Sequence, residues 1–119
     1  MVRYHNNSRN QKIAEIVPDC GLINNPEDML EIMVDAAYNG CNHIILHKMS
    51  LDPGFFDLKT GLAGEILQKF SNYRMKLSIV GNFTKYKSES LNAFISESNK
   101  KGDVCFVGSL SEAITRSDQ

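Results

Sequence analysis

Residues 44–67 read IILHKMSLDPGFFDLKTGLAGEIL, and this stretch decides the expected fold. It begins with a short apolar run that is typical of a strand buried on both faces. A loop containing Pro53 and Gly54 follows, and Asp57 then stands where a helix N-cap is expected. Beyond it, apolar side chains recur at the spacing of one helical face: Leu58, Leu62, Ile66 and Phe70. The stretch therefore predicts a strand, a loop and a helix in succession.

The same alternation of strand and helix continues along the rest of the chain. Helix starts are indicated by Asn25 before a proline and two acids, by Ser88, and by a capping box of Ser109 with Glu112. Strands separated by helices predict a mostly parallel sheet, whereas the first two strands are joined too closely for a crossover and should form a hairpin. The expected strands cover residues 12–17, 21–23, 43–47, 75–81 and 104–107, and the expected helices start near residues 25, 57, 88 and 109. We therefore expect an α/β fold with a mixed, mostly parallel sheet of about five strands and about four helices.

The length and composition are those of one domain. A chain of 119 residues, 42% hydrophobic and 23% charged, is long enough to bury a core as a single unit. We expect residues 1–10 to form a flexible N-terminal arm and residues 11–119 to form one α/β domain. No apolar run approaches the roughly 18 residues needed to span a bilayer, and the N-terminus does not resemble a signal peptide. A cytoplasmic protein is therefore expected.

Charge and cysteine usage argue against several kinds of partner and cross-link. A formal net charge of -1 gives no general attraction to nucleic acid or to an anionic membrane. The three cysteines, Cys20, Cys41 and Cys105, are odd in number, and none belongs to a C-x-x-C pair. We therefore expect no disulfide. Cys105 stands in an apolar run and is expected in the core.

The carboxyl ends of the expected parallel strands form one candidate site. Ligands of open α/β sheets usually bind at such ends. Helix N-termini near the same edge present free amides that favour an anion. The polar residues that follow these strands are the candidates for binding a ligand or partner: His47, Lys48, Asn82 and Ser109.

The start of the helix expected after residue 57 is the other candidate site. Thr60 is interpreted as a cap, an anion ligand or a phosphorylation site. Asp57 is interpreted as an N-cap or a catalytic acid, and Lys59 as a phosphate ligand or a solvated side chain. Gly61 and Gly64 inside a helix each cost about 1 kcal/mol relative to alanine. Their presence indicates a close approach of the backbone to the sheet or to a ligand.

Metal and catalytic signatures are weak. Cys41, His43 and His47 share one face of an extended segment, but ligands along one straight strand lie too far apart for tetrahedral zinc. We therefore expect no metal and no other cofactor. None of the phosphate-loop, dinucleotide-binding, hydrolase or zinc-protease motifs is present. A nucleophile pair of His47 with Cys41 or Cys20 stays open, but an enzyme is not the first expectation.

Two segments carry a resemblance to a known family. They are FFDLKTGLAGEILQKF at residues 55–70 and FVGSLSEAI at residues 106–114. Together they resemble a small bacterial family known only as domain of unknown function 4180, and the resemblance extends from about residue 12 to residue 114. This resemblance implies a family but no activity.

A more distant resemblance is to the sulfate-transporter and anti-sigma-factor-antagonist (STAS) domain. STAS domains carry Asp-Ser-Ser/Thr-Gly-Leu at the start of the helix after the third strand, and the first Ser is a kinase target. Asp57, followed by Thr60, Gly61 and Leu62, is similar with one extra residue, and Lys59 stands just before Thr60. The resemblance implies a STAS-like fold and makes Thr60 the candidate for phosphorylation.

These observations favour one function and leave others open. The first expectation is a non-enzymatic cytosolic regulatory or interaction module that binds a protein partner or a small anionic ligand around residues 57–61. The alternative is a small-molecule-binding protein or enzyme with a pocket at the strand ends, lined by His47, Lys48, Asp57 and Asn82. A homodimer with Phe55 and Phe56 as interface anchors is a further possibility, although core packing is the first expectation for both rings.

Overall fold

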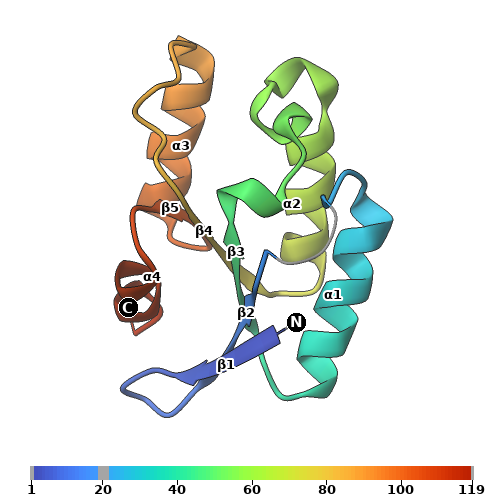
Figure 1. The fold of residues 1–119 in the computed structure, drawn as a ribbon, viewed down its shortest axis with the longest axis vertical. Helices are drawn as coiled ribbons and strands as arrows, with labels where there is room; N and C mark the ends of the chain where they lie inside the picture. Colours follow the sequence, from blue (N-terminus) through green and yellow to red (C-terminus); the bar gives the residue numbers. More distant parts are fainter. Residues whose placement is uncertain (1, 19–21, 119) are drawn as a thin grey trace.

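A five-stranded mixed sheet organises the computed structural model, which describes residues 2–18 and 22–118 (Figure 1). The strands are β1 (Val2–Asn6), β2 (Lys12–Ile16), β3 (His43–His47), β4 (Lys76–Val80) and β5 (Val104–Val107). The helices are α1 (Pro26–Tyr38), α2 (Leu62–Asn72), α3 (Glu89–Lys101) and α4 (Leu110–Arg116). Short 3-10 turns at Lys48–Ser50, Pro53–Phe56 and Leu58–Thr60 connect β3 to α2.

The strands lie in the sheet in the order of the sequence. β1 is antiparallel to β2, and β2, β3, β4 and β5 are parallel to one another. The parallel strands therefore place their carboxyl ends along one edge of the sheet, with His47 of β3 opposite Val80 of β4. The expected α/β class, with a mixed, mostly parallel sheet and four helices, is confirmed.

The N-terminal hairpin is formed by different residues from those expected. Residues 2–6, expected to belong to a flexible arm, form β1 and pair with β2 from Val2 opposite Ile16 to Asn6 opposite Lys12. The Asn7 side chain closes the turn, because its Oδ1 accepts hydrogen bonds from the amides of residues 9 and 11. The expected second strand of the hairpin, residues 21–23, does not pair with β2 within the described residues. Residues 19–21 lie outside them, and Ile23 makes only an isolated parallel bridge to residue 51.

Helices cover the two faces of the sheet unequally. Side chains of α1, α2 and α3 pack against one set of alternating strand residues, which includes Ile44, Leu46 and Leu77. The helix α4 packs on the opposite face, against Ile45 and Cys105. Figure 1 shows α4 beside β5, on the side of the molecule away from α1 and α2. The expected burial of Cys105 is confirmed.

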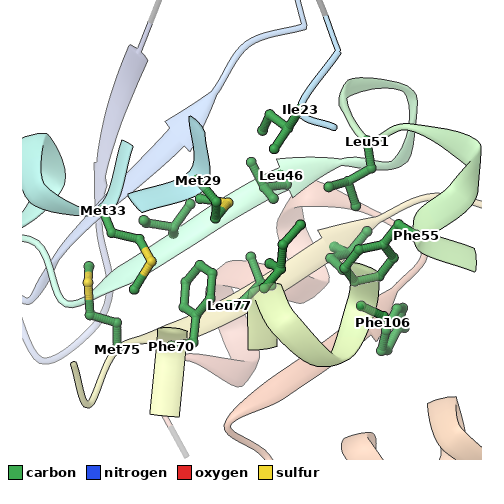
Figure 2. Packing of buried hydrophobic residues seen from close by; sticks show 14 of the residues in the cluster. Ile23, Met29, Met33, Leu46, Leu51, Phe55, Phe70, Met75, Leu77 and Phe106 are labelled. Atoms are coloured by element: carbon green, nitrogen blue, oxygen red, sulfur yellow. The ribbon is translucent and has the colours of Figure 1, made fainter. Parts of the chain in front are cut away.

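The larger of the two core clusters extends beyond the strands at both ends. Figure 2 shows Met33 and Met75 at one end of it and Phe55 and Phe106 at the other. Phe55 and Phe56 are only 1% and 8% exposed, and their rings meet edge to face with centroids 5.1 Å apart. Both rings therefore belong to the core, as first expected, and neither is free to anchor an interface.

Local capping determines where three of the helices begin. The side chains of Asn25, Ser88 and Ser109 accept hydrogen bonds from first-turn amides at 2.8, 3.2 and 3.1 Å, which confirms the expected caps. The second half of the capping box differs from the expectation. The Oε1 atom of Glu112 accepts from the amide of Gly108 at 3.1 Å, so Glu112 reaches back one residue beyond the cap.

The helix after β3 begins later than expected. Asp57 Oδ1 accepts a hydrogen bond from the amide of Lys59 at 3.2 Å, so Asp57 caps the 3-10 turn and not the helix. Gly61 then adopts a left-handed conformation with φ +76°. This residue separates the 3-10 turn from α2, which starts at Leu62. A Cβ atom added at Gly61 or Gly64 would meet nothing within 4 Å. Neither glycine therefore approaches the sheet closely, and a close approach to a ligand stays a prediction.

Candidate functional site

A cavity of about 820 Å³ lies at the carboxyl ends of β3 and β4. β3 contributes His47 and the following Lys48, and β4 contributes Val80 and the following Gly81 and Asn82. Because the two strands are parallel neighbours, the residues that follow them lie side by side. The rest of the wall comes largely from connecting segments: Leu22, Met49, Leu51, Pro53, Phe56 and Tyr86.

Most of the cavity wall is apolar. Phe56 and Tyr86 stack with their ring centroids 5.4 Å apart and an interplanar angle of 18°, and Phe83 lies 5.9 Å from Phe56. Leu22 and Met49 also line the cavity and are 49% and 70% exposed. Apolar and aromatic walls with a few polar groups are typical of small-molecule sites.

Lys48 is the most firmly positioned charge in the cavity. A Cβ atom added at Gly81 would lie 2.7 Å from Lys48 Cβ and 3.1 Å from its Cδ, so the lysine stem packs directly on the glycine backbone. The Lys48 Nζ donates to the carbonyl of Asn82 at 3.3 Å and lies 4.7 Å from the ring centroid of Tyr86. Burial raises the pKa of the Tyr86 hydroxyl, although the Lys85 charge opposes this effect. The hydroxyl therefore remains a proton donor at neutral pH.

A buried carboxylate on β2 holds the histidine of the cavity. Glu15 is 4% exposed, and its Oε2 lies 2.6 Å from His47 Nε2 while its Oε1 lies 2.9 Å from His5 Nε2. Burial by itself raises the pKa of the Glu15 carboxyl, but the hydrogen bonds and charges of the two histidines outweigh it and lower the pKa below its ordinary value. The three side chains link β1, β2 and β3 across one face of the sheet and orient the imidazole of His47.

The residues predicted from the sequence divide between two places. Three of them, His47, Lys48 and Asn82, come together in the cavity. The remaining candidates are not among the described residues that line it: Asp57, Lys59, Thr60, Gly61 and Ser109. Ser109 caps α4, and the other four belong to the exposed turn before α2. The pocket expected from the strand ends therefore excludes Asp57, because this side chain is used in capping the 3-10 turn.

Thr60 braces the turn in which it lies. Its Oγ1 is within donating distance of the carbonyl oxygens of Gly54 (2.7 Å) and Asp57 (2.9 Å), and it accepts a hydrogen bond from the amide of Leu62 at 3.2 Å. Thr60 is therefore not the N-cap of α2, which is Gly61 without a side-chain cap bond, although its hydroxyl does bond to the first amide of that helix. Phosphorylation of Thr60 stays a prediction, and it would remove the hydroxyl hydrogen that holds this turn.

The alternative that pairs Cys41 with His47 loses its geometric basis. Cys41 precedes β3 and His47 is its last residue, so the length of that strand, roughly 13 Å from His43 to His47, lies between them. Burial also raises the pKa of the Cys41 thiol, which keeps it protonated, so the pair of Cys41 with His47 is wrong as a nucleophile. Cys20 lies outside the described residues. Within residues 2–18 and 22–118, no group of three or more His, Cys, Asp or Glu is placed to hold a metal ion.

Glu15, which bonds to the cavity residue His47, and three residues of the cavity wall were missed from the sequence, although some left a signal there. Glu15 is an acid inside the apolar strand KIAEI, a position where a charge needs a buried partner. Lys85 and Tyr86 belong to residues 83–87, FTKYK, in which aromatic and basic side chains alternate. Phe56 gave no distinct signal, because a buried aromatic residue near a loop is ordinary core.

The chain belongs to a family whose function is unknown. The family model described as Domain of unknown function (DUF4180) matches residues 8–116. No curated protein and no solved structure matches the chain. The more distant resemblance to the STAS domain therefore stays a prediction. In the described part of the chain, no helix is both long enough and apolar enough to cross a membrane.

Proposed function

We propose that this member of the DUF4180 family binds a small molecule in the cavity at the carboxyl ends of β3 and β4. The observation that carries the proposal is the cavity itself. Its volume of about 820 Å³ lies within the range of roughly 300–1,000 Å³ that is usual for small-molecule sites. Its walls combine apolar and aromatic side chains with a few polar groups at the strand ends, as ligand sites in parallel sheets do.

The chemistry of the cavity supports binding in preference to catalysis. The described residues that line it include no Ser, Thr or Cys to act as a nucleophile and no Asp or Glu to act as an acid or base. His47 supplies the one imidazole among the described residues of the wall. Its Nε2 is already engaged by the buried Glu15 carboxylate at 2.6 Å. We therefore propose a non-enzymatic binding protein.

Phenylnaphthylamine, an uncharged dye that fluoresces in apolar surroundings, tests the proposal. We expect saturable binding, with amide NMR shifts at Met49, Gly81 and Tyr86, which line the cavity. Replacing Tyr86 by alanine should weaken dye binding, because the ring forms a stacked part of the wall. The matched control is Tyr38→Ala, since Tyr38 is 89% exposed on α1 and does not line the cavity.

Two results would refute this function. One is the absence of saturable dye binding to the folded protein. The other is dye binding whose NMR shifts map to the groove that contains Gly61, Gly64 and Gln68, with equal effects of Tyr86→Ala and Tyr38→Ala. The second result would move the ligand site to the start of α2, where the sequence first suggested it.

A second candidate function is a regulatory or interaction surface at residues 57–61, in a cytoplasmic protein. It is favoured by the exposure of all five residues, including Leu58, which is 37% exposed although it is apolar. Native mass spectrometry of the protein purified from its own cells tests it. A phosphate located at Thr60, or a bound partner that Lys59→Glu releases, would support this surface. An unmodified protein with no partner would count against it.

A further inference from the structure

The charges that line the cavity are all of one sign. Lys48 and Lys85 both line it, and among the described residues of its wall there is no Asp or Glu. The chain as a whole carries a formal net charge of -1, so this arrangement does not follow from a generally basic protein. The cavity therefore combines an apolar wall with a local excess of positive charge.

Lys48 has unused hydrogen-bonding capacity at a defined position. Its ammonium group carries three donors, and the Asn82 carbonyl accepts one of them at 3.3 Å. The same Nζ lies 4.7, 5.9 and 6.0 Å from the ring centroids of Tyr86, Phe56 and Phe83. These rings restrict where the ammonium can lie, since its stem is pressed against the backbone of Gly81. The remaining donors are available to a ligand in the cavity.

We propose that the ligand is a small organic acid, with one anionic group and an apolar body. This inference rests on the proposed binding function and adds the chemical class of the ligand. The anionic group pairs with the ammonium groups of Lys48 and Lys85, and the apolar body contacts Leu22 and Met49. A ligand of this kind would offset part of the positive charge of the two lysines and would cover the two apolar side chains that are exposed in the free protein.

A pair of dyes that differ in one charged group tests the inference. Anilinonaphthalene sulfonate carries an anionic group on nearly the same ring system as phenylnaphthylamine. We expect Lys48→Met to weaken binding of the sulfonate about tenfold, because this lysine is partly buried and rigidly placed. Lys85→Met should weaken it about threefold, because this lysine is exposed. Binding of the uncharged dye should change by less than about twofold in both variants.

A matched control separates a local contact from the general effect of net charge. Lys100→Met changes the net charge by the same amount, and Lys100 is exposed in the last turn of α3, outside the cavity wall. It should leave binding of both dyes unchanged. Circular dichroism of each variant verifies that it is folded.

The possible outcomes distinguish this inference from the function on which it rests. If the uncharged dye binds in the cavity but Lys48→Met and Lys85→Met leave the sulfonate affinity unchanged, the ligand class is wrong and the binding function stands. The ligand class is also wrong if Lys100→Met weakens the sulfonate as much as the two cavity variants do. If the uncharged dye does not bind the folded protein, the proposed function fails and the inference fails with it.

Discussion

The buried histidine at the start of β3 should make the stability of this protein fall below neutral pH. His43 is 6% exposed, and its Nε2 lies 2.8 Å from the hydroxyl oxygen of Ser78 on the neighbouring strand. Burial, together with the positive charge of Lys76 opposite it in the sheet, lowers the pKa of His43 from its ordinary 6.5 to about 4. The imidazole is therefore neutral in the folded protein at neutral pH.

The sign and size of the effect follow from this pKa. The unfolded chain binds a proton at this position below about pH 6.5, whereas the folded protein does so only below about pH 4. Stability is thus fully present above pH 6.5 and is lost progressively as the pH falls toward 4. At about 1.4 kcal/mol for each pKa unit, the difference amounts to about 3 kcal/mol of unfolding free energy.

The variant His43→Gln tests this reasoning, because glutamine can still bond to Ser78 but does not titrate. Urea unfolding followed by circular dichroism between pH 4 and pH 7.5 is the assay, since the chain has no tryptophan to serve as a fluorescent reporter. We expect the native protein to lose about 3 kcal/mol more than the variant over this range. All other titratable groups are shared, so the difference isolates His43. Parallel profiles, or an NMR titration of His43 with its midpoint near 6.5, would refute the argument.

Three further substitutions should act through single named contacts. Glu15→Gln should lower the unfolding free energy by about 2 kcal/mol at pH 7, because the side chain that bonds to the two histidines is then uncharged. The control Glu65→Gln, at an exposed position, should change the unfolding free energy by less than about 0.5 kcal/mol in the same urea assay. Gly81→Ala should cost about 1–3 kcal/mol and displace Lys48, visible as weaker binding of the anionic dye, and unchanged affinity would contradict the packing described. Asn25→Ala should cost about 1 kcal/mol in thermal unfolding through loss of the α1 cap, and an unchanged midpoint would show that the cap is dispensable.

Features that depend on neighbours in the sequence were predicted correctly. The strand at His43–His47 and the caps at Asn25, Ser88 and Ser109 lie where the sequence pattern placed them. A period of two along a strand and a hydrogen bond from a cap to the next turn involve residues a few positions apart. Such signals are complete within a short window of sequence.

Features that depend on a distant partner were missed or misplaced. The strand Val2–Asn6 has little apolar character, and it is a strand because Lys12–Ile16 offers it hydrogen bonds in an antiparallel register. The expected helix start at Asp57 moved to Leu62, because Asp57 and Thr60 close a separate turn that bonds to Gly54. Several arrangements of these loops satisfy the same local preferences, and tertiary packing selects one of them.

By itself, the sequence determined the α/β class, and it indicated that His47, Lys48 and Asn82 follow parallel strands. Hydrophobic periodicity carries that information, because strands joined through helices must pair in parallel. Only the tertiary structure decided that these residues share one cavity with Phe56, Lys85 and Tyr86, and that Glu15 holds two histidines. The bonds of Glu15 to the two histidines and the contact of Lys48 with Tyr86 join residues ten or more positions apart. They depend on strand order, register and the path of the loops, and no local pattern specifies these.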